Sequence, residues 1–278
     1  MNHLKGLYKI SRPLSTLTGA LAVLVGGYVA GTGAWVQVVL ASITTVLVSA
    51  SANAWNDYLD VEIDRINQPQ RPLPAGMLSP RAALLYSFAL AILSLITASF
   101  IGLSALAIAF VANLLLYIYS WKLKSTVLMG NATIALISAL SAIFGGVAAG
   151  NPLPTLWLAL IIGSGIMGRE VLKTLADYEG DLRQHCRTIA TTWGRRKARV
   201  VFYLLAALTL VMMMVPYLFN VFRPIYAYIV AIGVYPVVFY ILLRVTQYRT
   251  GPQLERLSQL MKYDFLVWFL AVLLGAAR

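Results

Sequence analysis

The chain has 278 residues, of which 60% are hydrophobic and 12% are charged, and its mean hydropathy is +0.77. Soluble globular proteins average about 25% charged residues, so the composition excludes a soluble domain and predicts an integral membrane protein. The net charge of +12 is explained by the basic loops of a membrane protein and by attraction to anionic headgroups or a phosphorylated substrate, rather than by nucleic-acid binding. A single cysteine, Cys186, excludes an intramolecular disulfide.

Apolar stretches near the ~20 residues that a helix needs to cross a bilayer recur along the chain. In chain order they cover residues 14–33, 35–54, 82–102, 105–121, 127–149, 156–167, 200–220, 226–243 and 265–277. The sixth and ninth are short on apolar residues alone, and we expect the sixth to continue through Arg169. We find no signal-peptide cleavage site before the first stretch, so we expect that span to be retained. The pattern predicts one domain over residues 1–278, built from about nine transmembrane helices.

The basic residues predict the orientation of the helices. With the N-terminus in the cytoplasm, every lysine and arginine except Arg223 and Arg278 falls in a segment on the cytoplasmic side, as the positive-inside rule requires. All ten carboxylates fall on that side in the same topology. We therefore expect a multi-pass protein with a cytoplasmic N-terminus and a functional site at the cytoplasmic face.

The first acidic segment, NDYLDVEID, follows the second apolar stretch. At about 100° per residue, a continuous helix places Asn56, Asp57, Asp60 and Asp64 on one face, while Glu62 points away. No cationic side chain lies among them, so these oxygen-bearing side chains repel one another in a partly dry site unless a positive ion is bound there. Oxygen ligands alone favour Mg²⁺.

The second acidic segment lies in GREVLKTLADYEGD, after the sixth stretch. Four residues share one face if the helix continues past Gly180, namely Glu170, Lys173, Asp177 and Asp181. Two carboxylate segments with neighbouring basic residues suit a diphosphate held through Mg²⁺, because two ions can neutralise a leaving group of about three negative charges. The simpler interpretation, two solvated loop ends that balance local arginines, does not explain the shared helical spacing after apolar spans.

NDYLDVEID and DYEGD resemble the NDxxDxxxD and DxxxD signatures of the UbiA superfamily of intramembrane prenyltransferases. The resemblance covers essentially the whole chain and includes RPLPAG after the first motif and YSWKLK after the fourth span. It implies an all-α membrane bundle around a central cavity that opens towards the lipid. It also implies Mg²⁺-dependent transfer of an isoprenoid chain from a prenyl diphosphate to a lipophilic acceptor. We infer neither a nucleic-acid partner nor an obligatory protein partner.

The resemblance also implies roles for individual residues. Metal ligands, for two expected ions, would be Asn56, Asp57, Asp60, Asp64, Asp177 and Asp181, of which Asp60, Asp64, Asp177 and Asp181 are the catalytic candidates. Substrate contacts are expected from Arg12, Arg71, Asn113, Tyr117, Lys124 and Lys173. On a continuous helix Asn113, Tyr117, Ser120 and Lys124 form one stripe, which favours Lys124 over Lys122. Where the family commonly has a glycine, this chain has His185, which is either a base for the acceptor proton or a solvated loop residue.

The acceptor is the open point. DVEIDRINQPQRPLPAG and LKTLADYEGD most resemble the branch that joins geranylgeranyl diphosphate to geranylgeranylglyceryl phosphate, the digeranylgeranylglyceryl phosphate synthases. The alternatives are an aromatic-acceptor enzyme that uses 4-hydroxybenzoate or another quinone precursor, a chlorophyll synthase-like enzyme, and a UbiA-type terpene cyclase. Two classes outside this family are disfavoured. A CDP-alcohol phosphatidyltransferase needs a DG-x-x-AR signature that is missing here. A secondary transporter carries its acids at the midplane of repeated halves, whereas the acids of this chain are expected at one face of the membrane.

Overall fold

The computed structural model describes residues 2–31, 33–248 and 250–276, without the side chains of Asn2 and Asn67. Over these ranges the chain forms helices and no strand. The helices group into two compact units, one made of residues 1–123 and 140–155 and the other of residues 124–139 and 156–278. The single domain expected from the sequence stays a prediction.

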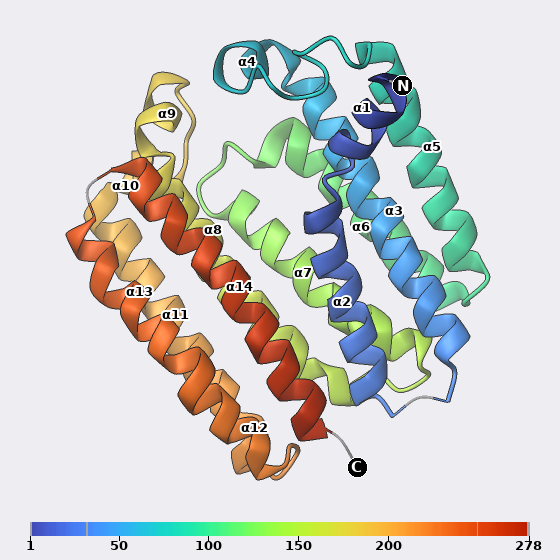
Figure 1. The fold of residues 1–278 in the computed structure, drawn as a ribbon, viewed down its shortest axis with the longest axis vertical. Helices are drawn as coiled ribbons and strands as arrows, with labels where there is room; N and C mark the ends of the chain where they lie inside the picture. Colours follow the sequence, from blue (N-terminus) through green and yellow to red (C-terminus); the bar gives the residue numbers. More distant parts are fainter. Residues whose placement is uncertain (1, 32, 249, 277–278) are drawn as a thin grey trace. The chain divides into compact units, whose positions relative to one another are not determined.

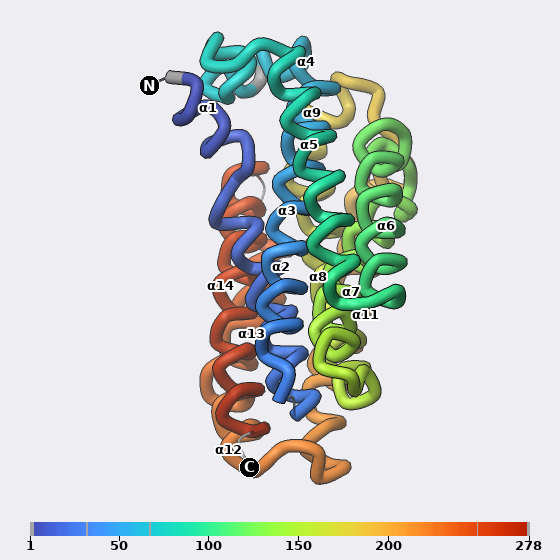
Figure 2. The backbone as a smooth tube through the Cα atoms, turned by 90° about the vertical axis from the view of Figure 1, so that its right-hand side faces the viewer, coloured from blue at the N-terminus to red at the C-terminus, as the bar shows by residue number. Residues whose placement is uncertain are grey.

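Unit 1 is built around α3 (Trp35–Leu59), which lies between α2 (Pro13–Val29) and α5 (Pro80–Ser99), as Figures 1 and 2 both show. The other helices that begin in this unit are α1 (Asn2–Ile10), α4 (Val61–Asn67), α6 (Leu103–Ile118), the π-helix η1 (Tyr119–Leu123) and the 3₁₀-helix η2 (Leu153–Thr155). Residues 140–148 of α7 (Met129–Ala148) also belong to it. The short helices α1 and α4 lie at the end of the unit where α3 stops (Figure 1).

Small residues let α2 and α7 approach each other closely within unit 1. A Cβ atom at Gly26 would lie 2.2 Å from the carbonyl oxygen of Ala142, and one at Gly145 would lie 2.0 Å from that of Val23. Close backbone approach through glycine is a common way of packing membrane helices, because apolar side chains gain little from leaving lipid. We infer that these two glycines fix the crossing of α2 and α7.

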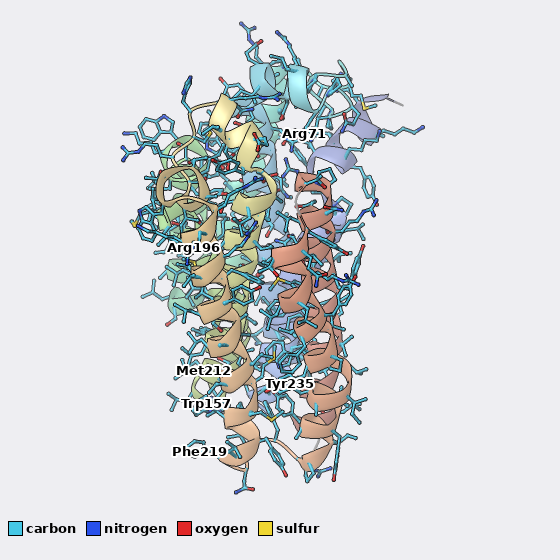
Figure 3. All side chains as sticks on the ribbon, turned by 90° about the vertical axis from the view of Figure 1, so that its left-hand side faces the viewer. Arg71, Trp157, Arg196, Met212, Phe219 and Tyr235 are labelled. Atoms are coloured by element: carbon cyan, nitrogen blue, oxygen red, sulfur yellow. The ribbon has the colours of Figure 1, made fainter. Side chains whose placement is uncertain are left out.

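Unit 2 packs α11 (Arg195–Leu218) and α14 (Gly251–Ala276) against α8 (Leu156–Ala176). Its remaining elements are residues 129–139 of α7, α9 (Tyr178–Arg183), α10 (Ile189–Trp193), α12 (Pro224–Ile229), the π-helix η3 (Val230–Val234) and α13 (Tyr235–Gln247). Arg196 lies near the start of α11, whereas Trp157 and Phe219 stack at its other end, with ring centroids 6.2 Å apart (Figure 3). The basic residues at the start of α11 are thus separated from its aromatic end by the length of a membrane span.

The all-α membrane class is confirmed. In the described part of the chain, eight helical segments are long and apolar enough to cross a membrane, and the shorter apolar helix α2 supplies the ninth stretch. The expected start of the last span is wrong, because α14 begins at Gly251 rather than at residue 265. Its predicted end, Ala277, and the C-terminal Arg278 lie outside the described residues. Asp264 therefore lies near the middle of a 26-residue helix, not in a cytoplasmic segment as the predicted topology had it.

Candidate active site

The sequence pattern placed the first acidic segment on one continuous helix. The structure shows that this is wrong. α3 ends at Leu59, and Asp60 lies at the junction with α4, at φ −92° and ψ 4°. Across this junction, the Asn56 side-chain amide donates a hydrogen bond to Asp60 Oδ2 at 3.0 Å. The break leaves Asn56 and Asp60 as neighbours, while Asp64 is carried by the short helix α4.

Two arginines from outside the first segment place positive charge beside its carboxylates. The Arg12 guanidinium pairs with Asp57, whose side chain is only 2% exposed. Arg71 Nη1 lies 2.6 Å from Asp64 Oδ2 and 3.6 Å from Asp57 Oδ1. Arg12 adopts the left-handed backbone conformation, φ 48°, immediately before α2. The predicted substrate residues Arg12 and Arg71 therefore lie beside the first acidic segment and offset two of its carboxylates.

The second acidic segment repeats the same break. α8 ends at Ala176, Asp177 lies at the junction at φ −84° and ψ 1°, and α9 follows. The sequence left open whether the helix continues past Gly180; the break lies earlier, at Asp177, and α9 runs through Gly180. Glu170 is buried on α8 and lies 3.1 Å from Arg169 and 3.3 Å from Lys173, so its charge is compensated locally.

Asp177 and Asp181 lack comparable compensation. Burial raises the pKa of Asp177; Lys173 lowers it, and the charges of Glu255 and Glu170 raise it further. Burial also raises the pKa of Asp181, to about 6, and the neighbouring Asp177 adds to the rise, although the Thr188 hydroxyl, Lys173 and Lys124 oppose it. Both carboxyls therefore hold a proton more readily than an ordinary aspartate does, which indicates a deficit of positive charge around them.

Glu255 was missed by sequence reasoning. The first turn of α14 packs closely on the end of α8, because a Cβ atom at Gly251 would lie 2.5 Å from the carbonyl oxygen of Ala176. Glu255 follows one turn later on the same side of α14, and its charge acts on Asp177. The available signal was Gly251-Pro252, since proline is common in the first turn of a helix.

The donors of both segments fit Mg²⁺. Carboxylate and amide oxygens are its usual protein ligands, and the raised pKa values of Asp177 and Asp181 indicate a place where a cation would be stabilised. Over residues 2–31, 33–248 and 250–276, no three His, Cys, Asp or Glu side chains converge as a ready metal cage. We infer that bound phosphate oxygens would have to complete the coordination, as is usual for Mg²⁺.

A divalent cation should stabilise the protein more at about pH 7.5 than at about pH 5. The raised pKa of Asp181 means that the cation-free protein loses stability as the pH rises from about 4 through about 6, because the folded state disfavours the ionised carboxyl. A bound cation relieves this loss only where the carboxyl is ionised. The test is the shift of the unfolding midpoint by MgCl₂ at each pH. Asp181→Asn should shrink the difference between the two shifts, and equal shifts in the unmodified protein would contradict the assignment.

Asn113 and Tyr117 take part in helix packing within unit 1. The Tyr117 hydroxyl lies 3.0 Å from Ser51 Oγ and 2.6 Å from Ser87 Oγ, and its ring stacks on Trp55 with centroids 5.0 Å apart. Asn113 donates hydrogen bonds to Ser94 Oγ and to the Ala109 carbonyl, both at 2.9 Å. These contacts join α6 to α3 and α5. A substrate contact by either residue remains a prediction.

The stripe that favoured Lys124 is not present, because α6 ends at Ile118 and the chain continues as the π-helix η1. Lys124 follows η1 and belongs to unit 2, where its charge acts on Asp181. Lys122 is exposed, and its Nζ lies 4.0 Å from the ring centroid of Trp121. The preference for Lys124 thus rests on its proximity to Asp181 rather than on helical periodicity.

His185, which the sequence offered as either a base or a solvated loop residue, is exposed at φ 53° in the loop after α9.

Lys124→Ala should therefore impair prenyl transfer more than Lys122→Ala. We expect about a tenfold or greater rise in KM for the prenyl diphosphate in the first variant, since hydrogen bonds to charged groups contribute about 1.5–3 kcal/mol. The exposed Lys122 should change KM by less than about twofold, because exposed charges contribute little. Steady-state kinetics on the two variants check this ranking, and the reverse order would contradict it.

Comparisons with known proteins agree with these features. The sequence profile of the UbiA prenyltransferase family matches residues 16–275. The digeranylgeranylglyceryl phosphate synthase of Methanopyrus kandleri is 35% identical over 215 residues, which cover 77% of this chain and 79% of that protein. The synthase of the same name from Methanosphaera stadtmanae is 30% identical over 268 residues, which cover 96% of this chain and 98% of that one.

Solved structures share the fold over nearly the whole length. A structure described as giving insights into the biosynthesis of digeranylgeranylglyceryl phosphate synthase in membranes has a TM-score of 0.82 at 28% identity, with 99% of both chains covered. A UbiA homologue from Archaeoglobus fulgidus, solved bound to GPP and Mg²⁺, has a TM-score of 0.73 at 20% identity and covers 96% of this chain and 99% of that one.

Proposed function

Because the chain belongs to the UbiA prenyltransferase family, we propose that it transfers a geranylgeranyl chain from geranylgeranyl diphosphate to geranylgeranylglyceryl phosphate in ether-lipid synthesis. The choice of acceptor is supported by relatives named digeranylgeranylglyceryl phosphate synthase, which are 30%, 35% and 39% identical over 77–96% of this chain. The catalytic part rests on one observation in this chain, the raised pKa values of the Asp177 and Asp181 carboxyls, which the neighbouring positive charges do not offset.

The proposed reaction breaks the bond between C1 of the prenyl chain and the diphosphate oxygen, and both bonding electrons leave with the diphosphate. The allylic cation that remains is stabilised by resonance. A hydroxyl oxygen of the acceptor donates the electron pair for the new ether bond, and its proton is released. Mg²⁺, when bound, supplies positive charge that neutralises the leaving diphosphate. The protein must therefore hold the diphosphate, offset its charge and exclude water from the cation.

The residues of the chain divide these tasks. The proposed metal ligands are Asn56, Asp60, Asp64, Asp177 and Asp181. Asp57 is buried between two guanidinium groups, so we assign it to orienting Arg12 and Arg71, which then contact phosphate oxygens. Lys173 lies in the second segment and Lys124 follows η1, and the charges of both act on Asp181; we assign them to offsetting the charge of this segment and of the diphosphate. We propose two Mg²⁺ ions, because both acidic segments carry oxygen donors.

The protein is an integral, multi-pass membrane protein. We propose that its N-terminus and its active site face the cytoplasm, because the positive-inside rule places the basic loops there. An acceptor phosphate would meet the same basic loops. Arg187 and Arg195 are candidates to hold it, and Arg195 already lies 4.4 Å from the ring centroid of Tyr178 beside the second segment.

The test of the acceptor is an incubation of the purified protein and Mg²⁺ with radiolabelled geranylgeranyl diphosphate and a panel of acceptors. We expect the label in digeranylgeranylglyceryl phosphate. Label on 4-hydroxybenzoate or another phenol, with none on the glyceryl phosphate lipid, would replace this proposal by an aromatic-acceptor enzyme. Label on chlorophyllide would indicate a chlorophyll synthase-like enzyme, and a cyclised hydrocarbon formed without acceptor would indicate a terpene cyclase.

A further inference from the structure

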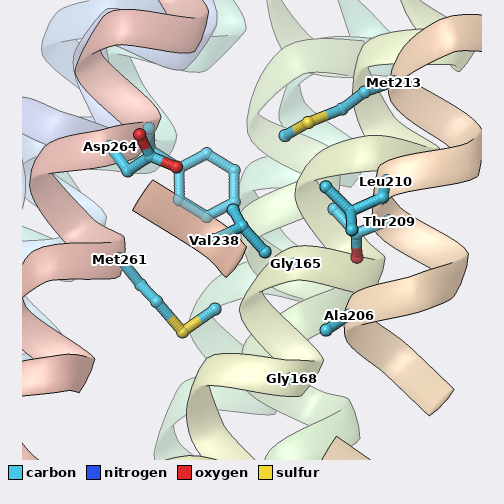
Figure 4. A pocket seen from close by; sticks show the side chains of 10 residues that line it. Gly165, Gly168, Ala206, Thr209, Leu210, Met213, Val238, Met261 and Asp264 are labelled. Atoms are coloured by element: carbon cyan, nitrogen blue, oxygen red, sulfur yellow. The ribbon is translucent and has the colours of Figure 1, made fainter. Parts of the chain in front are cut away.

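A cavity inside unit 2 is too small to hold a lipid chain. Its walls come from α8, α11, α13 and α14 (Figure 4), and its volume is about 30 Å³. Pockets that bind small molecules measure about 300–1,000 Å³. The surface of unit 1, where α1 precedes the first span, offers a clearer lipid contact.

The helix α1 packs on the rest of unit 1 along one face only. Ile10 is fully buried and packs in a cluster with Leu73 and Leu78. Gly6, one turn earlier, is also buried, and a Cβ atom there would lie 2.8 Å from Leu78 Cγ. These two positions lie one above the other on a helix, so they define the face by which α1 is attached.

The orientation of α1 is fixed at its end by Ser11. The Ser11 carbonyl oxygen accepts a hydrogen bond at 3.1 Å from the side-chain amide of Asn53 on α3. Its hydroxyl lies 2.9 Å from the Tyr86 hydroxyl on α5 and donates a hydrogen bond to the Leu7 carbonyl oxygen at 2.8 Å. Contacts to two different helices hold α1 against rotation about its own axis, so its other faces stay turned outward.

The outward surface of α1 divides into an apolar edge and a basic edge. At about 100° per residue, Leu4 and Tyr8 lie together on one edge, and Lys5 and Lys9 lie together on the next. Leu4 is 75% exposed and Tyr8 is 67% exposed. Both lysines are exposed, and neither side chain has a hydrogen bond or ion pair in the part of the chain that the structure describes.

The position of α1 along the chain places it at the boundary of the membrane. The first span, α2, begins at Pro13 and is inclined to α1 (Figure 2). Leu14 and Leu17, in the first two turns of α2, are 78% and 53% exposed and lie on one helix face, which is suited to lipid contact. The apolar edge of α1 therefore lies within a few residues of side chains that face the acyl chains.

An apolar edge beside a basic edge matches the surface of an anionic leaflet, where acyl chains and lipid phosphates lie within a few Å of each other. Tyrosine is favoured at this depth, because its ring is apolar and its hydroxyl reaches the headgroups. A stable protein interface buries about 800 Å² on each partner, which the two side chains of the apolar edge cannot supply. The charge and the small area both favour lipid over a protein partner.

We propose that α1 is an anchor on the anionic membrane surface, with Leu4 and Tyr8 among the upper acyl chains and Lys5 and Lys9 at lipid phosphates. Through Ser11, the anchor also fixes the segment that leads into Arg12. It is separate from the prenyl-transfer chemistry, so its test does not depend on the proposed function.

The experiment measures the depth of single spin labels at Leu4→Cys and Tyr8→Cys in a Cys186→Ser background, with the protein in phosphatidylglycerol nanodiscs. Glu62→Cys on α4 is the water-exposed reference, since that side chain is 74% exposed. Labels at positions 4 and 8 should collide more with oxygen and less with a water-soluble nickel complex than the label at position 62. Equal nickel access at all three positions would overturn the proposal. Protection from both reagents, with spin–spin broadening, would identify a second copy of the chain as the occupant and would also overturn it.

The role of the lysines is tested by exchanging phosphatidylglycerol for phosphatidylcholine. With both lysines present, the label at position 8 should move towards water in phosphatidylcholine, by up to about fivefold in the ratio of lipid-facing to water-facing label for each lysine. Lys5→Gln/Lys9→Gln should abolish this lipid dependence. Arg65→Gln/Lys122→Gln removes the same charge from two exposed positions outside α1 and should retain it. The same lipid dependence in both double variants would contradict a contact between α1 and lipid phosphates.

Discussion

Asp181→Asn should lower turnover by at least about 10²-fold, the loss typical of removing one group that stabilises charge in the transition state. The substitution keeps the size of the side chain but removes the negative charge that would hold a cation against the diphosphate. Asp60→Asn should have an effect of similar size, because neither acidic segment alone offsets both phosphates. The measurement is kcat for prenyl transfer at saturating Mg²⁺, together with an unfolding midpoint that shows the variants to be folded.

The control for Asp181 is Glu179→Gln, two residues away in α9. Glu179 is 68% exposed and lies 3.7 Å from Arg195, so it belongs to a weak surface pair. This variant loses the same charge from the same short helix and should retain turnover within about twofold. If Asp181→Asn retained full turnover, the assignment of Asp181 as a ligand would be wrong. If Glu179→Gln lost as much turnover as Asp181→Asn, the local charge of α9 rather than a specific ligand would be at work, and the assignment would also be wrong.

Arg71→Met should have the largest effect on stability, a loss of about 2–4 kcal/mol in the free energy of unfolding. Breaking a buried ion pair by removing one partner costs about 3–5 kcal/mol, and the 30% exposure of the Arg71 side chain reduces this cost. The loss arises because Asp64 and Asp57 remain buried with less positive charge beside them. Equilibrium unfolding in mixed micelles measures it.

Arg65→Met is the matched control for Arg71. Arg65 pairs with Glu62 at 2.8 Å on α4, but both side chains are well exposed, at 59% and 74%. Exposed pairs of this kind contribute about 0–1 kcal/mol. Similar losses in the two variants would mean that the burial of Asp57 and Asp64 is not what makes Arg71 important. Arg71→Lys should recover part of the stability, because it restores the positive charge without the planar fork of the guanidinium.

Hydrophobic runs predicted the membrane helices well, because a span needs about 20 apolar residues and few other segments contain them. The start of α14 was missed for the same reason. Glu255, Lys262 and Asp264 interrupt its apolar pattern, yet Leu254 and Leu257 bury one face of this turn against Leu172 and Leu175 on α8. Tertiary packing thus extends the helix through residues that a hydropathy window excludes.

The acidic residues of the candidate site were predictable from their motifs, but their local geometry was not. A fixed rotation of 100° per residue assumes an unbroken α-helix, whereas the chain breaks at Asp60 and at Asp177 and widens into a π-helix after Ile118. Arg12 and Arg71 reach Asp57 from segments distant in the sequence, which periodicity on one helix cannot reveal. Charge compensation is in this sense a tertiary property.

Metal-dependent prenyl transfer is tested most directly by following label from radiolabelled geranylgeranyl diphosphate into geranylgeranylglyceryl phosphate, with the purified protein in nanodiscs, in Mg²⁺ and in excess EDTA. We expect labelled ether product with Mg²⁺, its loss in EDTA and its return when Mg²⁺ is restored. Transfer that proceeds at the same rate in EDTA would contradict a metal-assisted departure of the diphosphate from the acidic segments at Asp60 and Asp181.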